Sequence, residues 1–268
     1  MQTEVYPRLA GKVVLLTGAW GGLGRTFARQ LLASKARLIL SDLAERPLAE
    51  LAEDGDLPAA REEAVLGQVA ADLGAPEGPR QLFEACRRIA PVDVVIHNAG
   101  AAFIGHYHDI PVDKMQLQMR VLLTAPMELT HLFVPDFLAR GHGHLVFVDS
   151  VAGFVATPLG TTYSAAKFGL RGFAMALAGE VRKRGLDVTI VYPFFTRTAI
   201  LKSPKFGDAR VPVMPRILID DPERVIRTAL RGVDRRRLHV WPGLYAKAMW
   251  QAIRFWPVIS SQMQPRSL

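Results

Sequence analysis

The sequence predicts an α/β fold of the Rossmann type: a doubly wound parallel sheet of about seven strands with helices on both faces. Short apolar runs rich in β-branched residues alternate along the chain with longer helical patterns. These runs are continuously apolar, which is typical of strands that helices cover on both faces. With 268 residues and no internal repeat or linker, the chain is expected to form a single domain, residues 1–268.

The expected strands are the apolar runs of this alternation. They comprise residues 12–17, 36–42, 65–69, 92–98, 143–150, 187–193 and 237–243. A long helix is expected from Tyr163 to Arg182, and the proline-rich stretch from Ser203 to Pro222 is the longest break in the pattern. That break follows the sixth strand, where doubly wound folds place ligand-binding loops.

The first expected strand leads into a glycine-rich turn, TGAWGGLGR, that opens a helical pattern. Glycines at positions 18, 22 and 24 permit unusual backbone angles and a close approach to a phosphate, while the helix N-terminus offers N–H groups and a partial positive charge. Such a turn alone is equally typical of a tight strand-to-helix connection. Its place after the first strand favours dinucleotide binding, with a pyrophosphate over Gly22 and Leu23.

An acidic residue, Asp42, ends the second expected strand. A carboxylate at this place accepts hydrogen bonds from an adenosine ribose and repels a 2′-phosphate. Neither Leu43 after it nor Gly21 in the loop is basic. The sequence therefore favours NAD(H) over NADP(H).

The stretch TYSAAK places Tyr163 and Lys167 four residues apart, on one face of an expected helix. A free tyrosine titrates near ~10, and a nearby ammonium favours its phenolate. The spacing alone also fits an ordinary amphipathic helix.

These segments, in this order, resemble the classical short-chain dehydrogenase/reductase family over nearly the whole chain. TGAWGGLG matches the family's TGxxxGxG loop, HNAG (97–100) matches its NNAG segment, and Tyr163 to Lys167 match YxxxK, with Ser150 thirteen residues before Tyr163. The resemblance implies Tyr163 as general acid or base, Ser150 as a hydrogen-bonding partner of the substrate oxygen, and Lys167 as a ligand of the nicotinamide ribose. The cofactor contacts that it implies are Gly18, Trp20, Gly22, Leu23, Gly24, Asp42, Asp72, Leu73, Asn98, Ala99, Gly100, Tyr163, Lys167, Pro193 and Thr198.

Three positions depart from the family's pattern. Leu122 in VLLTAP stands where the family usually has an asparagine that helps to hold a proton-relaying water, so a reduced or rerouted proton transfer is expected. Phe194 stands where a glycine is usual, next to Thr196 and Thr198, of which Thr198 is the preferred carboxamide ligand. His97 replaces the first asparagine of NNAG and is interpreted as structural.

Composition argues against several other classes of protein. The net charge of +8 comes mostly from arginines in EVRKRG (180–185) and RGVDRRR (231–237), which lack interleaved aromatics, so no nucleic-acid partner is expected. A single cysteine, Cys86, excludes an internal disulfide, and His106 with His108 lacks a third ligand, so no metal site is expected. The N-terminus resembles neither a signal peptide nor a membrane span, and a cytoplasmic location is expected.

The remaining expectations concern substrate and partners. Residues 194–220 are rich in apolar side chains, as expected of a lid over a small hydrophobic substrate. The C-terminal extension, residues 243–268, is expected to pack on the core or on a second subunit in preference to a membrane surface. An outward apolar set at Phe168 and Met175 resembles the family's subunit interface, so a homodimer or homotetramer is expected.

The favoured function is an oxidoreductase that interconverts a hydrophobic secondary alcohol and its ketone, or a related aldehyde. Two alternatives use the same nucleotide site. One is a nucleotide-binding sensor with weak or lost turnover, motivated by Leu122 and Phe194. The other is a lyase or epimerase that uses bound nucleotide without net consumption.

Overall fold

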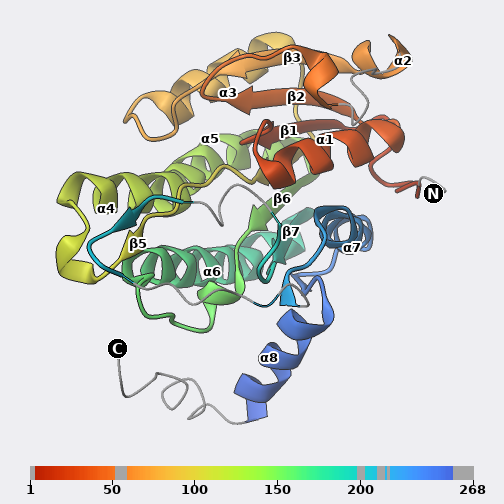
Figure 1. Cartoon of the computed structure of the whole chain (residues 1–268). Helices are drawn as coiled ribbons and strands as arrows, with labels where there is room; N and C mark the ends of the chain where they lie inside the picture. Colours follow the sequence, from red (N-terminus) through yellow and green to blue (C-terminus); the bar gives the residue numbers. More distant parts are fainter. Residues whose placement is uncertain (1–3, 52–58, 198–202, 210–214, 216–217, 256–268) are drawn as a thin grey trace.

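The computed structural model describes residues 4–51, 59–197, 203–209, 215 and 218–255. Within these residues a sheet of seven parallel strands forms the centre of the molecule (Figure 1). In spatial order the strands are β3 (Val65–Ala70), β2 (Arg37–Asp42), β1 (Val13–Thr17), β4 (Val94–His97), β6 (Gly143–Val148), β7 (Leu186–Val191) and β9 (His239–Val240). The predicted fold class is confirmed.

The strands form where the sequence has continuous apolar runs. Every residue of β1 and of β4 is buried, as in a sheet covered on both faces. The last strand, β9, is shorter than the expected run, and Pro242 and Gly243 follow it, Gly243 with a left-handed φ of +86°. A proline lacks the N–H that a continuing parallel ladder would need.

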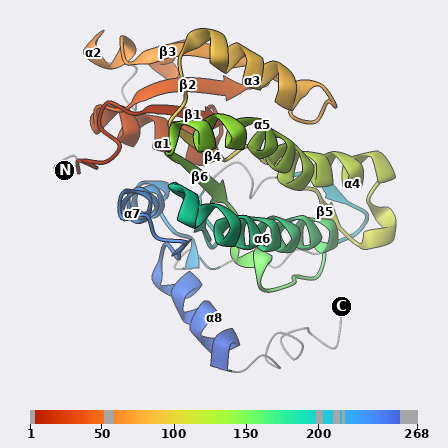
Figure 2. The ribbon, with the colours of Figure 1, turned by 180° about the vertical axis from the view of Figure 1, so that it is seen from behind.

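Two layers of helices enclose the sheet (Figures 1 and 2). One core lies against α1 (Gly22–Ala33) and α7 (Pro222–Asp234), and the other against α3 (Gly78–Ile89), α5 (Ala125–Arg140) and α6 (Thr161–Val181). The remaining helical elements are η1 (Leu48–Leu51), α2 (Ala59–Glu62), η2 (Tyr107–Asp109), α4 (Val112–Met119), η3 (Arg120–Thr124), η4 (Val151–Gly153), η5 (Arg182–Arg184) and α8 (Leu244–Phe255). Both faces of the sheet are thus covered, as the apolar runs predicted.

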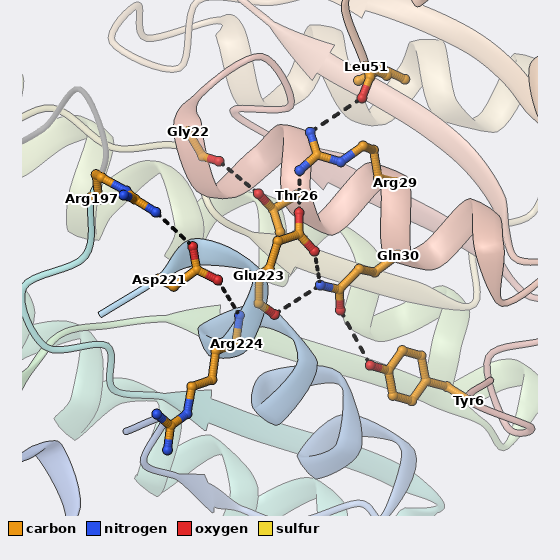
Figure 3. A network of polar contacts seen from close by, with 10 residues as sticks. All are labelled: Tyr6, Gly22, Thr26, Arg29, Gln30, Leu51, Arg197, Asp221, Glu223 and Arg224. Atoms are coloured by element: carbon orange, nitrogen blue, oxygen red, sulfur yellow. Dashed lines mark hydrogen bonds and ion pairs between the residues drawn. The ribbon is translucent and has the colours of Figure 1, made fainter. Parts of the chain in front are cut away.

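Helix α1 is fixed to α7 by a polar network (Figure 3). The Glu223 carboxylate accepts hydrogen bonds from Arg29 and, at 2.7 Å, from the Gln30 amide. Asp221 caps α7 by accepting from the Arg224 N–H at 3.3 Å. Because α1 carries the glycine-rich turn at its N-terminus, this network holds the orientation of the turn.

A second, two-stranded parallel sheet was not expected. It pairs β5 (Ile104–Gly105) with β8 (Lys205–Phe206), and so joins the segment after HNAG to the middle of the expected lid. A Cβ on Gly105 would lie 2.7 Å from the Phe206 carbonyl oxygen, so this close pairing requires glycine. The rings of Phe103 and Phe206 meet edge to face with centroids 6.2 Å apart.

Helices α4 and α5 join through η3 into one helix, Val112–Arg140, long and apolar enough by length and composition to cross a membrane. In this fold α5 packs on α3 and β6, and η3 packs on α6. Core helices of globular proteins meet the same criterion, so the property carries no conclusion about a membrane.

Candidate active site

The turn between β1 and α1 has no room for side chains at two of its glycines. Gly18 has a left-handed φ of +62°, and a Cβ there would lie 2.7 Å from the Ala99 Cα. A Cβ on Gly24 would lie 2.0 Å from the Gly18 carbonyl oxygen. No side chain caps the first turn of α1 after Gly21, and that turn holds no acidic residue. Its N–H groups and positive helix end therefore fit a pyrophosphate over Gly22 and Leu23.

Asp42 is held at the end of β2 by two backbone N–H groups. Its Oδ2 accepts from the Trp20 N–H and its Oδ1 from the Leu43 N–H, each at 2.8 Å. Each carboxylate oxygen retains a lone pair for a further donor, such as a ribose hydroxyl. The Trp20 side chain is buried in the core beside α1. The structure thus gives the predicted residue Trp20 a part in fixing Asp42.

The HNAG segment closes against the glycine-rich turn. The Asn98 amide donates to the carbonyls of Thr17 at 3.0 Å and Gly18 at 2.9 Å. The buried Thr17 hydroxyl in turn accepts from the N–H groups of Asn98 and Ala99, at 3.0 and 3.1 Å. Thr17 was not singled out from the sequence, although its place as the last residue of an apolar strand before the turn was a usable signal.

Two further predicted cofactor contacts, Asp72 and Leu73, follow β3 beside Asp42. The Ala71 N–H donates to the Asp42 carbonyl at 2.8 Å, so the ends of β2 and β3 are adjacent. Asp72 is exposed, and its Oδ1 accepts from the Gly74 N–H at 2.8 Å, whereas the Leu73 side chain is buried. The exposed carboxylate of Asp72 therefore lies close to that of Asp42 at the carboxyl edge of the sheet.

Ser150, Tyr163 and Lys167 come together at the carboxyl edge of the sheet. Ser150 follows β6 and caps η4, where its Oγ accepts from the Ala152 N–H at 3.1 Å. The Lys167 amine is buried, donates to the Val148 carbonyl at 2.8 Å, and lies 5.8 Å from the centroid of the Tyr163 ring. The three side chains thus lie in one cluster.

Burial dominates the ionisation of this cluster. It raises the pKa of Tyr163 to about 12, against a hydrogen bond from Ser150 that lowers the pKa, while the charge of Asp149 raises it further. Burial also lowers the pKa of Lys167, and the Asp149 carboxylate opposes that shift. In the protein alone Tyr163 is therefore a phenol at neutral pH, suited to donating a proton.

Asp149 is a residue of this cluster that the sequence did not reveal. It is 3 % exposed, directly before Ser150, and neither of its carboxylate oxygens has a hydrogen-bond partner in the described part of the chain. Burial raises its pKa to about 7, and Lys167, the Ser150 N–H and Arg171 oppose the shift in that order. The sequence did contain a usable signal for Asp149, namely an acidic residue directly after an apolar strand.

The helix around Leu122 is distorted despite the absence of an asparagine there. The element η3 is a π-turn in which the Ala125 N–H donates to the Arg120 carbonyl. The Thr124 hydroxyl donates to the same carbonyl at 3.3 Å, and the Leu122 side chain is buried. Within this turn a side chain two residues after Leu122, Thr124, thus bonds to the helix backbone.

The loop after β7 is only partly described. The Pro193 carbonyl accepts from the Val151 N–H at 3.0 Å, which ties this loop to the one after Ser150. Phe194 packs against the core and meets Phe195 edge to face, with centroids 4.9 Å apart. Thr196 is buried, with its hydroxyl bonded to the Phe194 carbonyl at 3.0 Å, whereas Thr198 lies outside the described residues.

The histidines singled out in the sequence have separate surroundings. His97 is buried, hydrogen-bonded to the Thr130 hydroxyl at 3.0 Å and stacked on Phe147. These are structural contacts, in agreement with the interpretation of His97. His106 and His108 stack with centroids 5.9 Å apart, and no group of three potential metal ligands occurs among the residues that the structure describes.

The model of the short chain dehydrogenase family matches residues 12–206, which hold the glycine-rich turn, HNAG, Ser150, Tyr163 and Lys167. The chain belongs to this family. The dehydrogenase is thus an oxidoreductase with a Rossmann-type nucleotide-binding fold.

Individual relatives agree with this assignment. The dehydrogenase is 32% identical to retinol dehydrogenase 10-A of Danio rerio over 248 residues, covering 84% of this chain and 72% of the relative. It is 30% identical to dehydrogenase/reductase SDR family member 7B of Danio rerio, over 93% of this chain and 85% of the relative. A short-chain dehydrogenase from Sphingobium yanoikuyae in complex with NADPH superposes with a TM-score of 0.75 at 27% identity, over 96% of this chain and 98% of that one.

Proposed function

We propose that the protein is an NAD(H)-dependent dehydrogenase that interconverts a hydrophobic secondary alcohol and its ketone, or a related aldehyde, with Tyr163 as general acid and base. The observation that carries this proposal is the convergence of Ser150, Tyr163 and Lys167 at the sheet edge where the glycine-rich turn and HNAG also meet. Retinol dehydrogenase 10-A, a relative by sequence, is named for an apolar alcohol.

The residues of the turn fit a dinucleotide. The first turn of α1 would bind the pyrophosphate, Asp42 the adenosine ribose, and Lys167 the nicotinamide ribose. The preference for NAD(H) is supported by the fixed carboxylate of Asp42 and by the apolar, 71% exposed Leu43 beside it. A bound nicotinamide supplies the acceptor or donor of the hydride.

The chain's own residues would position the substrate and move one proton. The Ser150 hydroxyl would donate a hydrogen bond to the substrate oxygen, while its own oxygen is oriented by the Ala152 N–H. In ketone reduction, Tyr163 would donate its phenolic proton to the substrate oxygen. In alcohol oxidation, the phenolate would accept the hydroxyl proton, and the Lys167 ammonium would stabilise that phenolate.

A hydrophobic substrate is supported by aromatic side chains on the β5–β8 pair and on the segment after β7. Phe103 and Phe206 contact each other across the β5–β8 pair, and Phe195 is 38% exposed on the segment after β7. Apolar surfaces of this kind favour a substrate with a large hydrocarbon part.

Self-association is supported by the outer face of α5 and α6. Met127, Phe168 and Met175 are exposed there, between 37% and 42% each. A groove of about 920 Å³, lined mainly by apolar groups of α4, η3 and the start of α6, adjoins this face. Exposed apolar side chains grouped in this way are typical of a protein interface. A homodimer or homotetramer through this face is proposed.

The cofactor is tested by calorimetric titration of the purified protein with NAD, NADH, NADP and NADPH. The reaction is tested with a panel of apolar alcohols and ketones, followed by the nicotinamide absorbance. Tyr163→Phe should retain nucleotide binding and reduce turnover by at least about 100-fold, the lower range for general acid–base catalysis. Tyr107→Phe is the matched control, because Tyr107 is 60% exposed and lies on η2.

Each outcome distinguishes a function. Micromolar binding of NAD(H) with turnover that Tyr163→Phe abolishes supports the dehydrogenase. Binding without turnover over the whole panel supports a nucleotide sensor, and product formation without net NADH change supports a lyase or epimerase. No nucleotide binding would contradict all three.

A further inference from the structure

Asp149 is a buried acid beside the catalytic pair. It directly follows β6, and its N–H donates to the Val191 carbonyl at 2.8 Å, which fixes its backbone between two central strands. Its carboxylate fills the space over Gly153, where a Cβ would lie 2.3 Å from the Asp149 Oδ2. Neither oxygen reaches solvent or has a hydrogen-bond partner among the described residues.

Two cations lie on one face of α6, and one of them, Lys167, bonds to the carbonyl of the residue directly before Asp149. Lys167 and Arg171 are four residues apart on the helix, and both act on the charge of Asp149. The Lys167 amine donates one of its three N–H bonds to the Val148 carbonyl. The Arg171 guanidinium lies over the Trp250 ring, with its Cζ 5.1 Å from the ring centroid.

The other groups that face this space come from four elements. They are Ser150 at the start of η4, Tyr163 on α6, Tyr192 after β7 and His239 on β9. The Tyr192 hydroxyl and the His239 Nδ1 form a hydrogen bond of 2.9 Å. Among the residues that the structure describes, Asp149 is thus the acid whose charge acts on both Lys167 and Tyr163.

We propose that the Asp149 carboxylate is the counter-ion that keeps the Lys167 amine protonated beside Tyr163, and so acts as a positioning residue for the catalytic pair. A buried ammonium is stable only with a compensating charge or full hydrogen bonding. Within the described part of the chain Lys167 has one hydrogen-bond acceptor, the Val148 carbonyl, and Asp149 supplies the compensating charge. This inference rests on the proposed function for its catalytic meaning, although the charge of Lys167 can be measured without turnover.

The arrangement explains how one acid can assist the phenolate instead of opposing it. An ionised Asp149 by itself disfavours a negative charge on Tyr163. Two cations share that acid, so the cluster of Asp149, Lys167 and Arg171 has a net charge of about +1 when all three are ionised. Ionisation of Tyr163 then neutralises the cluster. Without Asp149, the burial of Lys167 would favour its neutral amine, and the phenolate would lose its nearest cation.

The test is the charge of Lys167, read from the carbon-13 shift of its Cε in protein labelled at lysine and assigned by comparison with Lys167→Arg. Asp149→Asn keeps the shape of the side chain and removes its charge. Because an opposite charge at close range shifts a pKa by about 1–3 units, Lys167 should lose its proton at least about one pH unit lower in this variant. Alcohol oxidation at pH 7 should fall by about tenfold, while nucleotide affinity changes by less than about threefold.

Asp187→Asn is the matched control. Asp187 is a partly buried aspartate at the start of β7, paired with Arg236 at 3.1 Å at the opposite edge of the sheet from Lys167. This variant should leave the Lys167 titration unchanged. An unchanged titration in Asp149→Asn, or a shift to higher pH, would overturn the counter-ion role.

Two further readings keep the proposal testable if a variant does not fold or if the function is different. In the wild-type protein Lys167 must be an ammonium at pH 8, and a neutral amine there contradicts the proposal without any variant. A downward shift of Lys167 in Asp149→Asn, combined with no nucleotide binding by the wild type, would support the counter-ion and reject the dehydrogenase. Alcohol turnover by the wild type, combined with an unchanged pKa of Lys167 in Asp149→Asn, would support the dehydrogenase and reject the counter-ion.

Discussion

Acid should destabilise the protein through two buried histidines, His97 and His144. Burial lowers the pKa of each imidazole to about 3 from an ordinary 6.5. Each is hydrogen-bonded through Nε2 to a threonine hydroxyl, His97 to Thr130 at 3.0 Å and His144 to Thr189 at 2.9 Å. Between these two pKa values the unfolded chain binds a proton at each histidine and the folded chain does not. The free energy of unfolding is therefore unaffected above pH 6.5 and falls as the pH falls below it.

The magnitude follows from the width of that window. Each pH unit below 6.5 lowers the free energy of unfolding by about 1.4 kcal/mol for each histidine, so at pH 5 the two together remove about 4 kcal/mol. A typical domain has a total of about 5–15 kcal/mol. These two side chains alone should thus remove a large part of the stability by pH 5.

Urea unfolding at pH 7.5 and at pH 5 measures this loss, with the protein concentration held constant because an oligomer's stability depends on it. The comparison is with the double variant His97→Gln and His144→Gln, in which amides retain hydrogen-bonding groups but do not titrate. The wild type should lose about 4 kcal/mol more than the double variant between the two pH values. Equal losses would refute the assignment of neutral, buried imidazoles.

Three further predictions concern the nucleotide site and the helix beside it. Gly24→Ala should weaken nucleotide binding by at least about tenfold in calorimetry, since a Cβ there would lie 2.0 Å from the Gly18 carbonyl oxygen; unchanged affinity would contradict the described turn. Asp42→Ala should lower the ratio of NADH affinity to NADPH affinity by about tenfold, because it removes a negative charge beside the ribose 2′-position. An unaltered ratio would exclude Asp42 as the residue that selects the cofactor. Leu122 is 2% exposed, so Leu122→Asn should lower the melting temperature by several degrees, which corresponds to about 1–3 kcal/mol for an unpaired buried amide. Unchanged stability with faster alcohol oxidation would contradict this prediction. It would show that the amide finds hydrogen-bond partners and that proton transfer limits the rate of the wild type.

The elements that the sequence predicted well are those with a local signal. Every expected strand is present, because a run such as Val13–Thr17 is apolar on both faces wherever it is placed in the sheet. The glycine-rich turn, Ser150, Tyr163 and Lys167 could be singled out as candidates because their residue types and spacing match the chemistry and the family resemblance.

The features that the sequence did not predict depend on contacts between segments that are distant in the chain or on local backbone distortion. The β5–β8 pair joins Ile104 to Lys205 through two residues on each side, and so short a run has no periodicity to detect. The clustering of Asp149 with Arg171 arises only when β6 packs on α6, and a lone acid after a strand has many possible surroundings. The π-turn at Arg120–Thr124, with the Thr124 hydroxyl bonded to the Arg120 carbonyl, is a backbone distortion that a sequence pattern does not reveal.

The contact of α1 with α7 also has a consequence for folding during synthesis on the ribosome. Arg29 and its partner Glu223 are separated by 194 positions in the chain. Translation at about 5–20 residues per second needs roughly 10–40 seconds to cover that distance. Throughout this interval the helix that bears the glycine-rich turn lacks its contact with α7. The glycine-rich turn therefore gains the support of Glu223 only after that residue has been synthesised.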